Sequence, residues 1–277
     1  MESGKLPRIW VRSASALVAV AIVLGLGFFF QAKGFLLLVL AAVVLGTREL
    51  IPILFLSEDS LLLKSWFYLL CLGMFSLTTF YPASAALSFA CISILFLSTS
   101  LLRRKRFENL ELFSRFQIKS VLGLFYIGLL PSFAAQILQL PGGHLWFVAY
   151  LSVVLAGDTG AYLIGSRWGK RKLMPEISPN KTRLGLMGGL CSSSLVSSAF
   201  IFFIPNVPSL GLLALGTVCG LFGQMGDLFE SSLKRVAQVK DTGSLMPGHG
   251  GILDRIDGLL FAAPFFWLGA KILLRIH

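Results

Sequence analysis

The chain has 277 residues, of which 56% are hydrophobic and only 13% charged, and its formal net charge is +11. A soluble domain carries about 25% charged residues, so this chain has too few charges to cover the surface of a soluble protein of its size. The uncharged stretches at 13–30 and 208–225 also exclude a large soluble α/β core, because runs of this length match a bilayer core of about 30 Å. Such segments must be helical, since lipid offers backbone groups no hydrogen-bond partners.

The first apolar stretch, 13–30, follows Lys5, Arg8 and Arg12, a combination that also occurs in signal peptides. It is longer than a cleavable apolar region of about 7–15 residues and lacks a clear cleavage site with small residues. More apolar segments follow at once. We therefore interpret it as an uncleaved membrane anchor. The next segment, 34–46, is short, and we expect it to continue through 47–55.

Seven further apolar segments follow along the chain. We predict an all-α polytopic integral membrane protein with about nine transmembrane helices. We divide it into N-terminal transmembrane helices at 1–110, middle transmembrane helices at 111–165, and a C-terminal catalytic transmembrane region with cytoplasmic loops at 166–277. The segments are 13–30, 34–46, 65–80, 84–101, 120–137, 146–163, 186–204, 208–229 and 258–273.

The basic residues between these segments are distributed unevenly: 21 of the 24 lie on one side. The positive-inside rule places the larger group in the cytoplasm, which predicts a cytoplasmic N-terminus and an outer C-terminus. All 13 acidic residues belong to the inner stretches or to inner helix ends, so chemistry on charged substrates is expected at the cytoplasmic face. The inner group lies at the N-terminus and in 47–64, 102–119, 164–185 and 230–257, and the outer group is Lys33, Lys271 and Arg275.

Asp158, near the inner end of the predicted segment 146–163, breaks the ordinary composition of a membrane helix. A carboxylate inside the bilayer costs about 2.5–3.5 kcal/mol on insertion scales and is a functional candidate by default. The alternative is a carboxylate that reaches the interface or caps the helix.

The second unusual region runs from Gly226 to Gly258. Asp227 is expected to end the helix at 208–229, and Asp227, Glu230 and Lys234 are spaced to share one helix face. The stretch 247–251, Pro-Gly-His-Gly-Gly, cannot be regular helix, and its glycines permit the turns of an anion-binding site.

Asp254 and Asp257 follow this stretch, open the last helix and lie three residues apart on one face. The helix N-terminus there favours bound phosphate. Oxygen ligands on separate helices suit Mg²⁺, which is usually held by one or two carboxylates together with substrate phosphates. Carboxylates with lysine and arginine nearby are therefore typical of phosphoryl or nucleotidyl transfer. A structural cluster of salt bridges would use the same residue types.

A further cytoplasmic stretch, 165–182, offers lysine, arginine and hydroxyl side chains around a Ser-Pro-Asn turn at 178–180. In isolation it is equally well explained as a solvated loop on the positively charged side of the membrane.

The spaced motif from Ser232 to Asp257, S-L-K-R-x4-K-D-x-G-x3-P-G-H-G-G-x2-D-R-x-D, resembles the signature of the phosphatidate cytidylyltransferases, the CDP-diacylglycerol synthases. The stretches D-x-x-A-Y from Asp158 and S-P-x-K-T from Ser178 resemble a second block of that family, and Glu49 resembles its early acidic position. One position departs from the family pattern: residue 184 is leucine, where the family usually has glutamate.

The resemblance implies transfer of CMP from CTP to phosphatidic acid, giving CDP-diacylglycerol and pyrophosphate with Mg²⁺. It also implies a multi-pass protein of the cell inner (plasma) membrane whose active site faces the cytoplasm. It implies Asp227 and Asp254 as metal ligands and, with Asp158, Asp257 and Lys240, as catalytic residues. The implied substrate-binding residues are Ser178, Lys181, Lys234, Arg235, His249, Gly250, Gly251 and Arg255.

Two other functions remain as alternatives. A CTP-dependent lipid kinase would use similar residues but release CDP and not pyrophosphate. A secondary transporter would also have intramembrane carboxylates, but it should place polar residues near the midplane and not at helix ends on one side. We expect CTP, phosphatidic acid and membrane lipid as partners and no nucleic acid, and the sequence leaves open whether the chain forms a homodimer.

Overall fold

The computed structural model describes residues 8–55, 61–204, 207–243, 245 and 250–275, with the side chains of 8–20 and 23–24 left out. Within these residues, eight helical stretches are long and apolar enough to cross a bilayer. The prediction of an all-α polytopic membrane protein is therefore confirmed. The α-helices are α1 (Arg8–Leu54), α2 (Leu61–Phe80), α3 (Ala85–Leu101), α4 (Leu110–Gly123), α5 (Leu130–Ile137), α6 (Gly143–Trp168), α7 (Arg183–Ala199), α8 (Ser209–Val236) and α9 (Leu253–Arg275), and α4 and α5 belong to one of the eight stretches.

Shorter elements complete the chain. Helix α3 is flanked by the 3-10 turns η1 (Pro82–Ser84) and η2 (Arg104–Arg106), and α7 is followed by the 3-10 turn η4 (Phe200–Phe202). The π-helix η3 (Leu124–Leu129) joins α4 to α5. A hairpin of β1 (Lys172–Met174) and β2 (Ser178–Thr182) follows α6. Its strands pair antiparallel, with Lys172 opposite Thr182 and Met174 opposite Ser178.

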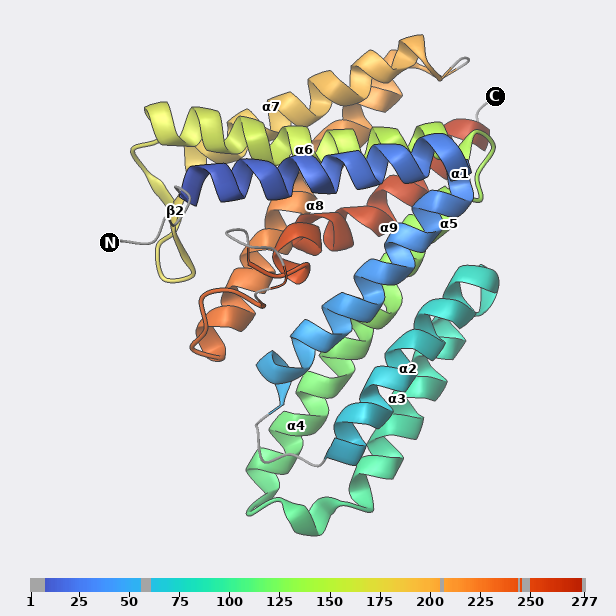
Figure 1. Ribbon diagram of the computed structural model, residues 1–277, viewed down its shortest axis with the longest axis vertical. Coiled ribbons are helices and arrows are strands. Elements are labelled where there is room, and N and C mark those ends of the chain that lie inside the picture. The colour runs from blue at the N-terminus through green and yellow to red at the C-terminus, as the bar shows by residue number, and fades with distance from the viewer. Residues whose placement is uncertain (1–7, 56–60, 205–206, 244, 246–249, 276–277) are drawn as a thin grey trace, which may run out of the picture.

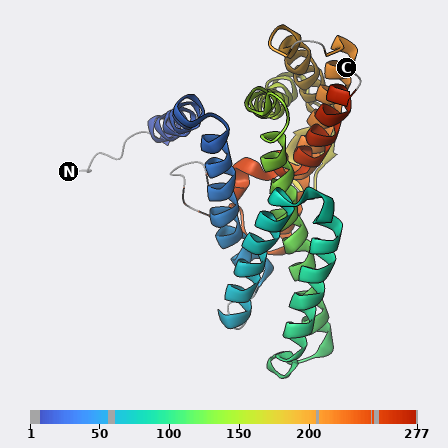
Figure 2. The ribbon, with the colours of Figure 1, turned by 90° about the vertical axis from the view of Figure 1, so that its right-hand side faces the viewer.

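Helix α1 is bent at Gln31, whose φ of 49° and ψ of −128° are not helical. Gly34 follows, and its missing Cβ leaves room for the carbonyl of Leu26. The bend falls between the first two predicted segments, so α1 supplies both of them. The second limb continues to Leu54, as the sequence predicted. The first limb overlaps α6 in Figure 1, but Figure 2 shows that it lies well to one side of the bundle.

The connections fall on two sides of the molecule. Figure 1 shows the start of α1, the β1–β2 hairpin, the α3–α4 junction and the end of α8 toward the left and bottom. The bend in α1, the α2–α3 and α5–α6 connections and the end of α9 lie toward the upper right. The basic residues predicted the same two groups of connections, and the assignment of one group to the cytoplasm stays a prediction.

Helices α6, α7 and α8 pack closely through small residues. A side-chain carbon added at Gly160 would meet Ser192, and one at Gly216 would meet Ser197. The Ser193 hydroxyl donates to the Val153 carbonyl at 2.9 Å. Small residues let membrane helices approach closely and hydrogen-bond across the interface. This packing fixes the inner ends of the three helices relative to one another.

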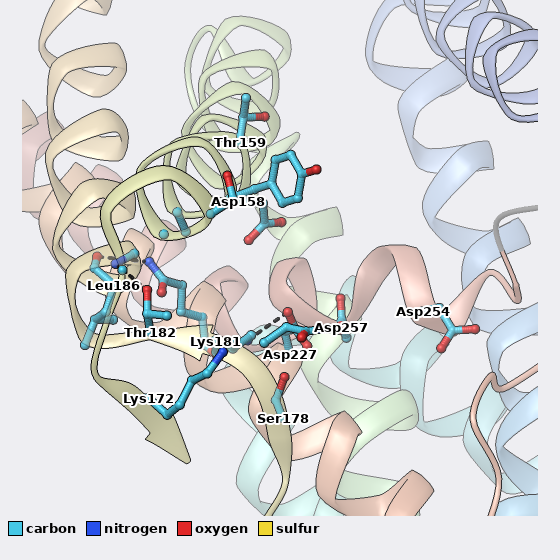
Figure 3. Close-up of a pocket in the computed structure, with 18 of the residues that line it drawn as sticks. Asp158, Thr159, Lys172, Ser178, Lys181, Thr182, Leu186, Asp227, Asp254 and Asp257 are labelled. Carbon is cyan, nitrogen blue, oxygen red and sulfur yellow. Dashed lines mark hydrogen bonds and ion pairs between the residues drawn. The ribbon is translucent and has the colours of Figure 1, made fainter. Parts of the chain in front are cut away.

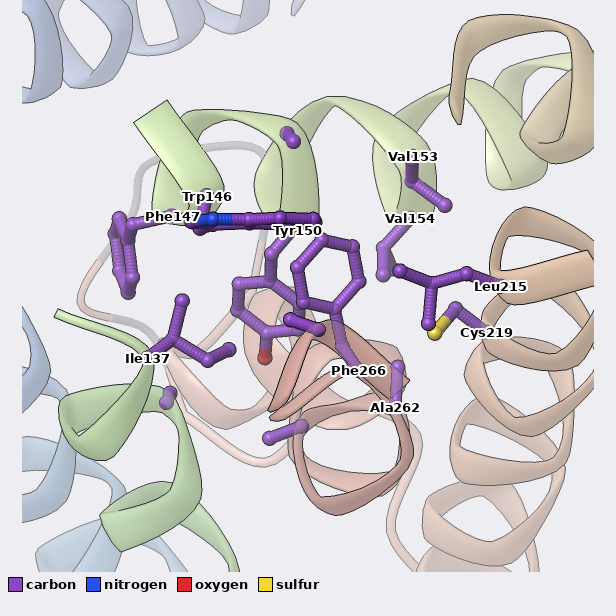
Figure 4. Close-up of a cluster of buried hydrophobic side chains, with 14 of the residues drawn as sticks. Ile137, Trp146, Phe147, Tyr150, Val153, Val154, Leu215, Cys219, Ala262 and Phe266 are labelled. Atoms are coloured by element: carbon purple, nitrogen blue, oxygen red, sulfur yellow. The ribbon is translucent and has the colours of Figure 1, made fainter. Parts of the chain in front are cut away.

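The larger hydrophobic cluster lies where α6, α8 and α9 meet. Tyr150 packs against Phe266, with ring centroids 5.4 Å apart, and its hydroxyl donates to the Leu259 carbonyl at 2.6 Å. Trp146 and Phe147 complete this aromatic group (Figure 4). A second cluster, around Phe67 and its neighbours, joins α2, α3 and α4. The division into three regions at residues 110 and 165 stays a prediction.

One helix boundary differs from the sequence prediction. Asp227 does not end its helix, because α8 continues through Lys234 and Arg235 to Val236. The apolar segment ends near 229, but the helix continues beyond it into the polar region. Asp227 and Glu230 therefore lie on a rigid helix and not at its frayed end.

Candidate active site

A cavity of ≈ 810 Å³ lies between the C-terminal halves of α6 and α8 and the starts of α7 and α9, beside the β1–β2 hairpin. Its polar lining contains both carboxylates and cations, and four of the carboxylates come from three different helices (Figure 3). It brings together eight of the residues that the sequence predicted to be functional. These are Asp158, Ser178, Lys181, Asp227, Lys234, Asp254, Arg255 and Asp257.

The hairpin places Lys181 in the cavity. Thr182, at the end of β2, caps α7 by accepting a hydrogen bond from the Gly185 amide at 3.1 Å. Lys181 therefore projects from a strand that is anchored at a helix start. Its Nζ lies 2.7 Å from Asp227 Oδ2 and donates to the Gln224 carbonyl at 3.2 Å. Both contacts tie the hairpin to α8.

Asp227 is the more accessible of the two predicted metal ligands. Its side chain is 39% exposed, and Ser231, one turn later in α8, donates to its Oδ1 at 3.2 Å. Asp158, from α6, is also exposed, whereas Asp257, from α9, is buried apart from its face on the cavity. Figure 3 shows Lys181 directed toward Asp227.

Asp254 has a different environment, because four donors surround its carboxylate. Lys234 Nζ lies 2.6 Å from Oδ1. Oδ2 accepts hydrogen bonds from the Thr242 amide and hydroxyl, both at 3.0 Å, and from the Gly251 amide at 2.7 Å. Asp254 thus organises the segment before α9 as well as facing the cavity.

Lys234 joins two carboxylates. Besides Asp254 it contacts Glu230 Oε2 at 2.5 Å, and the Lys234 and Glu230 side chains are 14% and 1% exposed. The predicted common face of Glu230 and Lys234 is confirmed. Because both carboxylates are within contact distance, Lys234 is held in place before any substrate binds.

The remaining predicted residues that the structure describes do not line the cavity. Arg235 is exposed, and its Nε donates to the Ile177 carbonyl at 3.1 Å, which supports the turn of the hairpin. Lys240 is exposed. Gly250 has a φ of +84°, and Gly251 is buried against Glu49 and Thr242 outside any helix, so the non-helical backbone predicted there is confirmed at these two positions. His249 lies outside the described residues.

Several residues at the site were not among the predicted catalytic, metal-binding or substrate-binding residues. Gln224, Lys172 and Asp241 line the cavity. Glu49, from the second limb of α1, accepts hydrogen bonds from the first amides of α9. Sequence spacing gives no signal for Glu49, because some two hundred residues separate it from its partners.

The oxygen donors fit a divalent cation that arrives with a phosphate ligand. Mg²⁺ is usually held by one or two carboxylates plus substrate phosphates, and Asp227 offers an accessible carboxylate for this. Asp254 fits if one of its four donors is exchanged for the cation. Within the described part of the chain, no group of three or more acidic, histidine or cysteine residues forms a metal site by itself.

Comparison with known proteins is consistent with this chemistry. Residues 10–273 match the cytidylyltransferase family. The chain is 44% identical over 149 residues to the phosphatidate cytidylyltransferase of Bacillus subtilis, which covers 53% of this chain and 55% of that protein. It is 42% identical over 178 residues to the enzyme of the same name from Staphylococcus aureus, covering 64% of this chain and 66% of that protein. The matches thus span between about half and just under two thirds of these relatives.

Proposed function

The chain belongs to the cytidylyltransferase family, and we propose that it transfers CMP from CTP to phosphatidic acid. In this reaction a phosphate oxygen of phosphatidic acid attacks the α-phosphorus of CTP. The bond from that phosphorus to the oxygen bridging the β-phosphate breaks, so that CDP-diacylglycerol forms and pyrophosphate leaves. The observation that carries the proposal is the single cavity in which carboxylates and cations from helices α6, α8 and α9 meet the hairpin.

The position of the cavity suits both substrates. It lies at the ends of membrane-spanning helices, the depth at which a phospholipid presents its phosphate. The hairpin side is polar and basic, which suits a triphosphate from solution. A phosphate oxygen is already a nucleophile, so the reaction needs no serine or cysteine nucleophile. Catalysis then consists of positioning and of stabilising charge.

Individual residues have distinct roles in this proposal. Lys181 and Arg255, with Ser178, bind and orient phosphate groups, and Lys172 adds positive charge at the edge of the cavity. Asp227 and Asp254 would hold Mg²⁺, which when bound neutralises phosphate charge and stabilises the leaving pyrophosphate. Asp158 and Asp257 support this arrangement from α6 and α9.

We further propose that the protein lies in the inner membrane and that the cavity opens to the cytoplasm. The support is the placement of 21 of 24 basic residues in the inner stretches, together with the separation of the chain connections onto two sides (Figure 1). The N-terminus would then be cytoplasmic and the end of α9 outside. CTP would enter from the cytoplasm, and phosphatidic acid from the inner leaflet.

The test uses purified protein in detergent with phosphatidic acid, Mg²⁺ and CTP labelled at the α-phosphate. We expect label in a lipid product and an equal amount of pyrophosphate. Release of CDP and transfer of no CMP would identify a CTP-dependent lipid kinase. Absence of both products, with protein that still unfolds cooperatively, would overturn an enzymatic function and favour transport.

A further inference from the structure

Glu49 connects the second limb of α1 to the start of α9. Its Oε1 accepts a hydrogen bond from the Ile252 amide at 3.1 Å, and its Oε2 accepts one from the Leu253 amide at 2.9 Å. The Thr242 hydroxyl lies 3.2 Å from the same Oε2. A single carboxylate from a distant helix therefore contacts both ends of the segment 242–253.

The amides that Glu49 binds are unsatisfied donors by nature. The first amides of an α-helix have no carbonyl partner within the helix, and a negative charge near them is favourable because of the helix dipole. Leu253 begins α9, so Glu49 caps this helix from outside its own sequence. In doing so it fixes the position of the first turn of α9.

The backbone around Glu49 is shaped to admit its carboxylate. A Cβ added at Gly243 would lie 2.5 Å from Glu49 Oε1, and one at Gly251 would clash with Glu49 Oε2 and the Thr242 hydroxyl. Both glycines therefore allow the carboxylate to sit against the backbone. Side chains at these positions would displace it.

Thr242 joins Glu49 to Asp254. Its hydroxyl lies within hydrogen-bond distance of both carboxylates, 3.2 Å from Glu49 and 3.0 Å from Asp254. Each of the two acidic groups thus contacts both ends of the same segment. Since the first turn of α9 supplies Asp254, Arg255 and Asp257 to the cavity, its displacement would move all three.

We propose that Glu49 is a positioning residue for nucleotidyl transfer, and this rests on the proposed function. It is not among the residues that line the cavity, and both of its oxygens already accept protein donors. It acts through α9, by keeping Asp254, Arg255 and Asp257 in the geometry that the phosphates require. Helix α1 is thereby a part of the active-site scaffold.

The first experiment measures turnover of Glu49→Gln, which keeps the shape of the side chain but replaces one acceptor oxygen with a donor. We expect kcat to fall about 10–100-fold, the typical cost of losing a residue that orients a ligand. Gln136→Leu is the matched control, because it removes a buried hydrogen bond from Gln136 to the Thr78 carbonyl far from the cavity. The control should lower the thermal midpoint comparably and leave kcat almost unchanged.

A double-mutant cycle separates positioning from general stability. Coupled residues show non-additive effects, whereas distant residues add. We expect Glu49→Gln and Thr242→Val to be non-additive in kcat, and Glu49→Gln and Gln136→Leu to be additive. Near-normal kcat in Glu49→Gln would overturn the proposal. So would an equal loss of kcat in Glu49→Gln and Gln136→Leu at equal loss of thermal midpoint, because kcat would then follow general stability.

A readout without turnover keeps the two proposals distinguishable. Leu245 is 54% exposed in the segment that Glu49 holds. The rate at which a thiol reagent labels Leu245→Cys, after the rate of the parent protein is subtracted, therefore reports on this segment. Glu49→Gln should raise that rate several-fold. If the wild-type protein formed no CDP-diacylglycerol, the proposed function would fail, and an unchanged labelling rate would separately overturn the role of Glu49.

Discussion

Lys181 in the β1–β2 hairpin lies 2.7 Å from Asp227 in α8, and this ion pair joins the hairpin to the helix bundle. The Lys181 side chain is also held by the Gln224 carbonyl. Both charged groups line the cavity, so each is placed to meet a phosphate or its metal ion. The pair keeps a cation and a carboxylate in place before substrate arrives.

The first prediction follows from this pair. Lys181→Ala should lower kcat/KM for CTP by about 10²–10³-fold, because a preorganised cation at developing phosphate charge is lost. Arg115→Ala is the control, since it breaks an ion pair of equal length with Glu111 whose side chains are 67% and 71% exposed. Such surface pairs contribute about 0–1 kcal/mol. A similar loss of turnover in both variants would show that Lys181 has no special role.

The second prediction separates the two candidate metal ligands. Asp227→Asn should remove most turnover with little change in thermal midpoint, because its side chain is 39% exposed. Asp254→Asn should remove turnover and also destabilise the fold, since it leaves the mostly buried Lys234 with one carboxylate fewer. Breaking a buried pair typically costs about 3–5 kcal/mol. Paired measurements of thermal midpoint and kcat check this, and equal destabilisation by both variants would be contrary to it.

The third prediction concerns Mg²⁺. A chelator should abolish turnover reversibly while the thermal midpoint of the protein alone changes little, because in the proposed site the metal would be shared with the nucleotide and would not be part of the fold. Asp227→Asn should then need more Mg²⁺ for half of its maximal activity. Full activity in excess chelator would overturn the metal requirement. An identical Mg²⁺ dependence in wild type and Asp227→Asn would remove this residue from the metal site.

The sequence predicted the helices well because the bilayer leaves so few alternatives. The segment boundary near residue 31 coincides with the bend at Gln31, and Asp254 and Asp257 do open α9. The turn expected at 178–180 was wrong, because these residues belong to β2 and the turn lies at 175–177. The hairpin was not predicted, because Ser178–Thr182 carries no alternating apolar pattern. Strand β2 is held by its pairing with β1 (Lys172–Met174) and by the ion pair of Lys181 with Asp227.

Long-range contacts at the site were beyond the reach of sequence spacing. The contact of Glu230 with Lys234 follows from helix periodicity, but Lys234 also reaches Asp254 on another helix. Glu49 resembled an acidic position of the family, yet nothing in the sequence connected it to Leu253. Such contacts depend on how α1, α8 and α9 pack.

The fourth prediction tests membrane orientation. Cysteines at Glu108, between α3 and α4, and at His144, at the start of α6, should react with an impermeant thiol reagent from opposite sides. Both positions are exposed. His144 is preferable to the neighbouring Gly142, whose φ of +66° disfavours any side chain. In intact cells only His144→Cys should react, and in inverted vesicles only Glu108→Cys. Labelling of both from one side would contradict the proposed orientation.

The last prediction concerns Leu184, where the family usually has glutamate. Leu184 lies in the first turn of α7 and is 42% exposed, and no acidic residue is present in that turn. A carboxylate there would be favoured by the helix dipole, so Leu184→Glu should fold at least as well as the native chain. Lys181 lies three residues earlier in the chain, in β2, just before Thr182 caps α7. The new charge would therefore lie near the cation that we propose binds phosphate.

We therefore expect the native protein to be active, and Leu184→Glu to change its rate or its KM for CTP by about 10–100-fold, as residues that orient a ligand do. Lys181→Ala should lower turnover far more than Leu184→Ala. The Lys181 variant loses the cation that contacts Asp227 of α8, whereas the half-exposed leucine contributes only packing. Pyrophosphate release by all three variants in one detergent decides this. If Leu184→Ala abolished activity and Lys181→Ala did not, the hairpin would act through packing, and its assignment to phosphate binding would be wrong.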